Sequence, residues 1–119
     1  MEILNYTGFD KIYYLDVFEK ELSKLTKQDP KYANWLERKL EILERGATAA
    51  TDGKQFEKLS NCKLFSIRNV SKQNERIIYY IIDEDDSVIL LCAFNERNKS
   101  DYRNAISKAL QRLKILEEE

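Results

Sequence analysis

Two apolar segments that lie close together in the sequence constrain the fold of this chain more than any other feature. They cover residues 76–82 (RIIYYII) and 88–94 (VILLCAF). Both are rich in β-branched and aromatic residues, and both are nearly continuous rather than alternating, which is typical of strands covered on both faces. Asp85, Asp86 and Ser87 between them form a turn sequence. The pattern predicts a buried β-hairpin with further elements packed on each side.

Two more strands are predicted outside this hairpin. Residues 64–68 alternate, with Phe65 and Ile67 on one face and Ser66 and Arg68 on the other. Residues 11–15 (KIYYL) predict either a first strand or the start of a helix that continues through residues 18–25. We favour a strand followed by a short helix.

Two later helices have recognisable ends. Asp29 is a good N-cap, Pro30 suits a first helical position, and Gly46 is suited to end this helix, which would pair antiparallel with the preceding one. Ser100 is a plausible N-cap for the last helix. One apolar stripe follows it, at Tyr102, Ile106, Ala109, Leu113 and Leu116. The order strand, helix, helix, strand, strand, strand, helix predicts an α+β fold with a mostly antiparallel sheet packed against helices.

The composition limits the functions that the chain can have. With 119 residues, it is expected to form a single domain over residues 1–119. It has no histidine, and Cys62 and Cys92 form no C-x-x-C pair, so we expect neither a metal site nor a cofactor. Cys92 is expected to be a small buried apolar residue. There is no membrane-length apolar segment and no signal-peptide pattern, so we expect a cytoplasmic protein without a membrane partner.

The net charge of −1 conceals an uneven distribution of charge. Cations dominate between residues 63 and 76 and recur at residues 97–103, whereas acids gather at 83–86 and 117–119. Arginine and lysine bind phosphates, and tyrosine can stack on a base or transfer a proton. The distribution indicates a local basic face, with an ordinary mixed surface as the alternative. The candidate residues are Lys63, Arg68, Lys72, Arg76, Arg97, Lys99, Tyr102 and Arg103.

These segments, in this order and at this spacing, resemble the RelE/ParE toxin superfamily of bacterial type II toxin–antitoxin systems. The likeness is greatest to the RelE and HigB-like members, including phage-derived ones, and it is carried by residues 59–68, 76–79, 88–94 and 97–109. The resemblance implies a small microbial-ribonuclease-like fold. It also implies a metal-independent endoribonuclease that cleaves mRNA on the ribosome and is neutralised by a cognate antitoxin, with a toxin–antitoxin heterotetramer as one arrangement.

The candidate residues fall into two groups under this resemblance. The catalytic group is Arg76, Arg97, Lys99 and Tyr102, and the RNA-binding group is Lys63, Arg68, Lys72 and Arg103. We expect Arg76 and Arg97 to stabilise negative charge in the transition state, because a guanidinium stays charged and binds phosphate with two donors. Ser66 stands where some RelE members carry a catalytic lysine. Glu96 is either a general base or an ion-pair partner of Arg97.

Several alternatives stay open at this point. Arg68 could pair with an acid, Tyr102 could be packed between helix and sheet, and Lys99 could be a solvated loop residue. A ParE-like inhibitor of DNA gyrase would have the same fold without nuclease chemistry. A non-catalytic remnant would keep only the fold and antitoxin binding.

Overall fold

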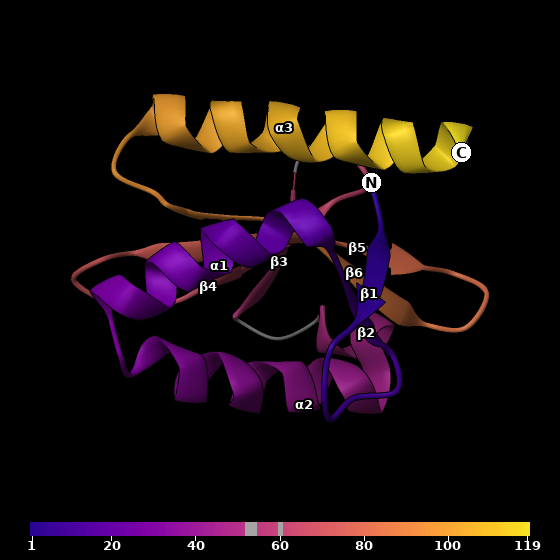
Figure 1. Cartoon of the computed structure of the whole chain (residues 1–119), viewed down its shortest axis with the longest axis horizontal. Coiled ribbons are helices and arrows are strands. Elements are labelled where there is room, and N and C mark those ends of the chain that lie inside the picture. The colour runs from indigo at the N-terminus through magenta and orange to yellow at the C-terminus, as the bar shows by residue number, and fades with distance from the viewer. Residues whose placement is uncertain (52–54, 60) are drawn as a thin grey trace.

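A computed structural model of the chain describes residues 1–51, 55–59 and 61–119. Within these residues it has a six-stranded sheet, in the order β1-β2-β6-β5-β4-β3, and three helices (Figure 1). The strands are β1 (Ile3–Asn5), β2 (Ile12–Leu15), β3 (Phe56–Lys58), β4 (Phe65–Arg68), β5 (Glu75–Ile82) and β6 (Ser87–Asn95). The helices are α1 (Asp16–Gln28), α2 (Tyr32–Ala50) and α3 (Lys99–Glu118). The α+β class and the order of the predicted elements are confirmed, and two short strands are added.

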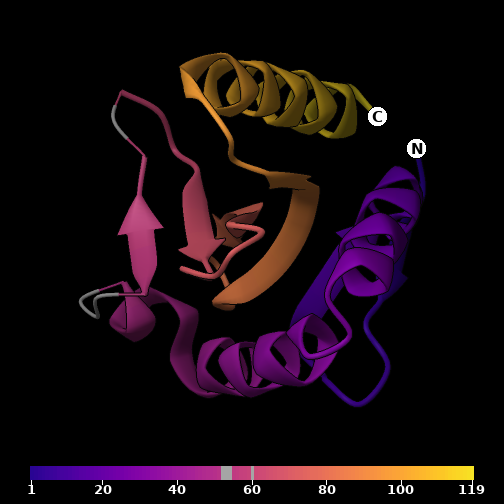
Figure 2. The same ribbon diagram turned by 90° about the vertical axis from the view of Figure 1, so that its left-hand side faces the viewer.

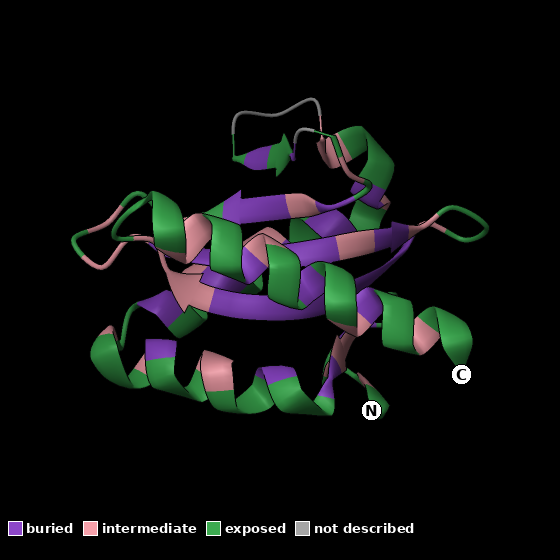
Figure 3. Ribbon diagram, turned by 90° about the horizontal axis from the view of Figure 1, so that it is seen from above, coloured by how far each residue is buried: buried purple, intermediate pink, exposed green. Residues whose placement is uncertain are grey.

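The predicted hairpin forms the centre of the sheet. β5 and β6 pair antiparallel from Glu75 and Asn95 to Ile82 and Ser87, with an irregularity after Ile78. All residues from 75 to 79 and from 87 to 93 are buried, as the purple strands of Figure 3 show. α3 lies over one face of the sheet and α2 over the other (Figure 2). Covering on both faces explains why these two segments are continuously apolar.

Cys92 lies in this buried layer, as predicted. Its side chain is part of the hydrophobic core, and burial raises the pKa of its thiol to about 12. Each helix in the described part of the chain is too short or too polar to cross a lipid bilayer.

The N-terminal half of the sheet differs from the prediction. Residues 11–15 contribute a strand and then a helix, as favoured, but β2 pairs parallel with β6, with Ile12 opposite Val88. The sheet is therefore mixed, with four antiparallel pairs and this parallel one in the described residues. The first residues form β1, which was not predicted, because a three-residue strand at a sheet edge has too little sequence pattern to be recognised.

Two predicted helix N-caps were wrong. Asp29 does not cap α2 directly; its carboxylate accepts the backbone N–H of Lys31 at 3.2 Å, and the helix begins at Tyr32. The helix breaks at Gly46, where its end was predicted, but a further helical segment follows and α2 extends to Ala50. α3 is capped by Asn98, whose side chain accepts the backbone N–H of Asp101 at 2.9 Å, two residues before the predicted Ser100. Residues 52–54, which follow α2 in the sequence, lie outside the described residues.

β2 ends before β6 does, and two side chains complete the backbone pairing of β6. β2 pairs no further along β6 than Leu90. Beyond that point, the Arg112 guanidinium donates to the Leu91 carbonyl at 2.7 Å, and the Glu21 carboxylate accepts the Ala93 N–H at 3.3 Å. Glu21 and Arg112 also pair with each other at 2.8 Å. This ion pair fixes α1 and α3 against the same strand edge, where unpaired backbone groups would be costly.

We expect Arg112→Met to lower the free energy of unfolding by about 2 kcal/mol, because the Leu91 carbonyl and Glu21 both lose a charged donor. Lys108→Met is the matched control: Lys108 also contacts Glu21, at 3.3 Å, but its side chain is 51% exposed. The Lys108→Met change should lower the free energy of unfolding by less than about 1 kcal/mol. Urea unfolding of the two variants gives the comparison, and equal losses would contradict a special role of Arg112 at the strand edge.

Candidate functional site

Arg76 is the centre of the candidate site, and it is buried. It lies on β5 opposite Arg68 of β4 and Phe94 of β6, so these three side chains share one face of the sheet. α3 covers this face, and the guanidinium carbon of Arg76 lies 4.5 Å from the ring centre of Tyr102 in that helix. Only 3% of Arg76 is exposed.

Every guanidinium nitrogen of Arg76 has a partner. Nε donates to the Ser66 hydroxyl at 3.1 Å, Nη2 to Glu57 at 3.0 Å and Nη1 to Glu96 at 2.9 Å. The partners come from β4, β3 and the residue that follows β6. Two carboxylates therefore compensate one buried cation, which keeps the desolvated charge tolerable. Glu96 pairs with Arg76 and not with Arg97, contrary to the pairing considered from sequence.

Tyr102 is a protonated phenol in this arrangement. Burial raises the pKa of its hydroxyl; the Arg76 cation opposes that shift, and the carboxylates of Glu57 and Glu96 add to it. A phenol with a raised pKa can donate a hydrogen bond or a proton, but it is a poor base at neutral pH. The two sequence interpretations of Tyr102 are therefore compatible, since a half-buried ring can stack on Arg76 while its hydroxyl serves as a donor.

Arg68 is the accessible arginine next to this cluster. Its side chain is 45% exposed, and its Nε lies 3.3 Å from the Asn74 side-chain oxygen and 4.0 Å from Glu96. It lines a hollow of about 340 Å³ together with Trp35 and Glu57. Arg68 can therefore reach a phosphate in solution, whereas Arg76 would first have to leave its carboxylates.

The connection from β6 to α3 supplies further cations. Arg97 is exposed there, and Lys99 and Arg103 are exposed in the first turns of α3. The backbone N–H of Arg97 donates to the Asp101 carboxylate at 3.0 Å. A second hollow, of about 230 Å³, separates this connection from α1. Its lining residues are Lys24, Leu25, Phe94, Asn95, Arg97 and Asp101.

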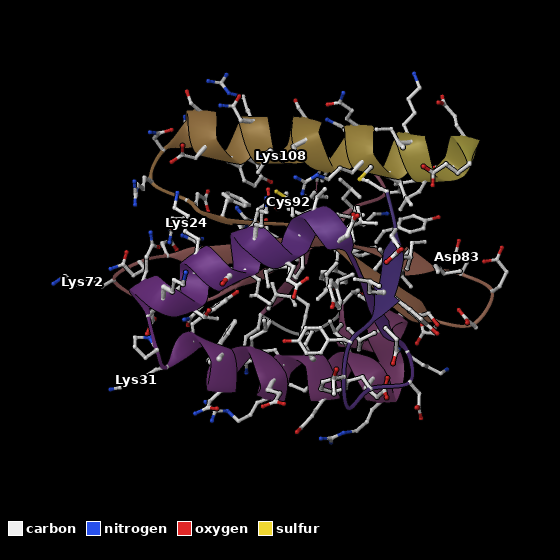
Figure 4. All side chains as sticks on the ribbon, in the orientation of Figure 1. Lys24, Lys31, Lys72, Asp83, Cys92 and Lys108 are labelled. Atoms are coloured by element: carbon white, nitrogen blue, oxygen red, sulfur yellow. The ribbon has the colours of Figure 1, made fainter. Side chains whose placement is uncertain are left out.

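The remaining two predicted residues lie apart from each other. Lys72 is exposed in the β4–β5 connection, at the same end of the molecule as the start of α3 (Figure 4). Lys63 lies at the other end, where its ammonium pairs with Glu117 in the last turn of α3 at 3.0 Å. The structure thus brings Arg68, Arg76 and Tyr102 together, places Arg97, Lys99 and Arg103 beside them along the chain, and leaves Lys63 separate.

Sequence reasoning missed two parts of this region. Glu57 lies on the short strand β3, whose three residues carry no recognisable period. Lys24 lies on α1, where Lys20, Lys24 and Lys27 recur at helical spacing; this pattern could have indicated a basic helix face.

A comparison with known protein families identifies the family of this chain. The family model described as phage derived protein Gp49-like (DUF891) matches residues 25–114, which include Arg68, Arg76, Arg97 and Tyr102. The chain belongs to the Gp49-like family. This is a RelE/HigB-like toxin family, so the resemblance drawn from the sequence is supported at the level of the family. No curated protein sequence matches the chain.

On the other face of β5, Glu75 forms a buried acidic cluster near the start of α2. Its Oε1 accepts hydrogen bonds from Asn69 at 3.1 Å and from Ser71, and its Oε2 is buried with no partner in the described structure. Burial raises the pKa of Glu75, the Ser71 hydroxyl opposes this shift, and the neighbouring Asp29 carboxylate adds to the rise. The folded protein therefore retains the Glu75 proton to a higher pH than the unfolded chain does.

Stability should consequently fall as the pH rises from the ordinary glutamate range through the raised pKa of Glu75. We expect Glu75→Gln to flatten this fall and to be more stable than the unchanged protein at neutral pH. Urea unfolding between about pH 5 and pH 8 measures the effect. Glu41→Gln, on the exposed face of α2, is the control and should leave the pH dependence unchanged. A Glu75→Gln variant with the original pH slope would contradict the assignment.

We expect Arg76→Met to lower the free energy of unfolding by about 3 kcal/mol, because Glu57 and Glu96 then lose their buried counter-charge. Arg97→Met, which removes an exposed arginine, should change stability by less than about 0.5 kcal/mol. Thermal and urea unfolding test both variants. Equal stability of the two would show that the carboxylates do not depend on Arg76.

Proposed function

We propose that this member of the Gp49-like family is the toxin of a type II toxin–antitoxin system and acts as an mRNA endoribonuclease on the ribosome. The observation that carries the proposal is a set of accessible cations beside a protonated tyrosine. Arg68 lies opposite Arg76 in the sheet, Tyr102 stacks on Arg76, and the exposed Arg97 and Lys99 directly precede Tyr102 in the chain. Such a set suits a phosphodiester, because it offers positive charge for the phosphate and a proton donor for a leaving oxygen.

The reaction we propose uses the RNA as its own nucleophile. The ribose 2′-oxygen attacks the adjacent phosphorus and loses its proton, the bond to the 5′-oxygen breaks, and that oxygen takes up a proton. The products are a 2′,3′-cyclic phosphate and a free 5′-hydroxyl. The step requires an aligned phosphate, charge stabilisation and proton transfer, but no metal or cofactor.

Each residue has a distinct part in this proposal. Arg97 and Lys99 stabilise the charge on the phosphate, since both are exposed and their cations have no carboxylate partner among the described residues. Tyr102 is the proton donor. Arg76 is a positioning residue rather than a phosphate ligand, because its nitrogens are occupied and its plane supports the Tyr102 ring.

Glu96 provides the carboxylate that this scheme needs as a proton acceptor. Its Oε2 lies 2.9 Å from Arg76 and 4.0 Å from Arg68, and its side chain is 21% exposed. A substrate phosphate that binds Arg68 would come near this carboxylate. The cognate antitoxin is the proposed partner, and it would silence the toxin by covering these cations.

The paired state of Arg76 is equally consistent with a second candidate, a toxin of the same fold that binds DNA gyrase without cleaving RNA. A guanidinium neutralised by two carboxylates is a structural element in either case. The two functions differ in the first effect on a cell: an interferase stops translation, whereas a gyrase inhibitor stops DNA synthesis.

Induced expression in a bacterial host distinguishes the two functions. We expect rapid loss of pulse-labelled protein synthesis, with new mRNA 5′ ends inside reading frames. Continued translation with blocked DNA synthesis would overturn the proposal and support the gyrase inhibitor.

We expect Tyr102→Phe to lower the rate of ribosome-dependent mRNA cleavage by about 100-fold, because the ring still stacks on Arg76 but the proton donor is lost. Arg97→Ala should lower it by a similar factor through the loss of charge stabilisation. Tyr80→Phe and Arg45→Ala are the matched controls, since both residues lie away from the site, and both variants should cleave at the original rate. Full activity of Tyr102→Phe would remove its role as the acid.

A further inference from the structure

One end of the molecule carries cations from four separate segments. They come from the end of α1, the start of α2, the β4–β5 connection and the start of α3, and Figure 4 labels three of them, Lys24, Lys31 and Lys72, at this end. The full set is Lys24, Lys27, Lys31, Lys72, Arg97 and Lys99, and all six are exposed. None of them forms an ion pair with another described residue. We call this set the basic end.

The carboxylates near the basic end are occupied by other partners. Asp29 accepts the backbone N–H of Lys31, Glu96 pairs with Arg76, and Asp101 accepts the backbone N–H of Arg97. Asp29 and Asp101 keep their negative charges, but the six exposed cations outnumber them, so the basic end has a net positive charge. The acids of residues 83–86 and 117–119 lie at the opposite end, where Figure 4 labels Asp83 and Figure 1 marks the C-terminus. A net charge of −1 thus divides into a positive end and a negative end.

The hollow of about 230 Å³ connects the lysines of α1 to the candidate site. Lys24 lines it from α1 and Arg97 from the β6–α3 connection, and Phe94, Asn95 and the Asp101 carboxylate are also part of its lining. This lining suits a nucleotide, because Lys24 and Arg97 can bind phosphates and the Phe94 ring offers a stacking surface. An acidic peptide would match the positive charge of the hollow, but it has no base that would stack on Phe94.

We propose that the basic end binds the phosphate backbone of a single-stranded RNA, with Lys24 and Lys27 of α1 holding the strand as it crosses the hollow to Arg97. This rests on the proposed function and extends it, because it adds α1 and the α1–α2 turn to a site predicted only from the second half of the chain. Lys24 and Lys27 lie three residues apart on one helix face, so their ammonium groups form a track and not a single point of contact.

The test compares two double variants that remove equal charge. Lys24→Gln with Lys27→Gln removes two cations from the basic end, and Arg45→Gln with Lys114→Gln removes two exposed cations elsewhere. Affinity for a fluorescent single-stranded oligoribonucleotide is measured as a function of salt. We expect the first double variant to raise Kd about tenfold and to reduce the salt slope by about 1.4, since each lost phosphate contact contributes about 0.7 for a single strand. The second should leave both values unchanged.

Three outcomes would overturn the assignment. Equal weakening by the two double variants would mean that only net charge matters. Unchanged RNA affinity of the first would mean that RNA passes elsewhere. Tighter binding of duplex DNA or polyglutamate than of RNA, with the same dependence on Lys24 and Lys27, would assign the basic end to another partner. Because binding is measured apart from cleavage, an inactive protein that still binds RNA through Lys24 and Lys27 would overturn the proposed function and leave this proposal standing.

Discussion

A buried cation at one end of the central hairpin determines how the surrounding elements meet. Arg76 has lost nearly all its contact with water, and a buried guanidinium without counter-charges would destabilise the fold by several kcal/mol. Its partners come from β3, β4, the end of β6 and α3. The short edge strand β3 and the start of α3 are consequently tied to the same point of the sheet, although they are more than forty residues apart in the sequence.

Because Arg76 is buried, the residues that support the candidate site differ from the residues that could contact a substrate. The buried Arg76 supports the Tyr102 ring and pairs with Glu57 and Glu96. The outer cations, Arg68 and Arg97, are exposed and can meet a phosphate. A rigid inner layer under an accessible outer layer is what a phosphodiesterase needs, since charge stabilisation depends on groups that are already oriented when the substrate arrives. The same inner layer would also serve a toxin that binds a protein target.

A second constraint is the division of charge between the two ends of the molecule. Glu96 pairs with Arg76, and the six exposed cations of the basic end outnumber Asp29 and Asp101, so this end keeps a positive field. Acids at the far end would repel a polyanion there. Electrostatic attraction can thus orient the molecule before contact, with the hollow and the candidate site facing the nucleic acid.

The sequence by itself determined the central hairpin, the three helices and the α+β class, because local periodicity and turn residues such as Asp85 and Asp86 specify these elements directly. It also located the cations of residues 63–76 and 97–103, and the resemblance carried by these segments and the hairpin is supported by the family model. Only the tertiary structure decided that β2 pairs parallel with β6, that β1 and β3 complete the sheet, and that Arg76 is enclosed by Glu57 and Glu96. Only the tertiary structure also decided that Lys24 and Arg97 line the same hollow. These features depend on contacts between distant segments, and neither strand partners nor the burial of a charge can be read from a local pattern.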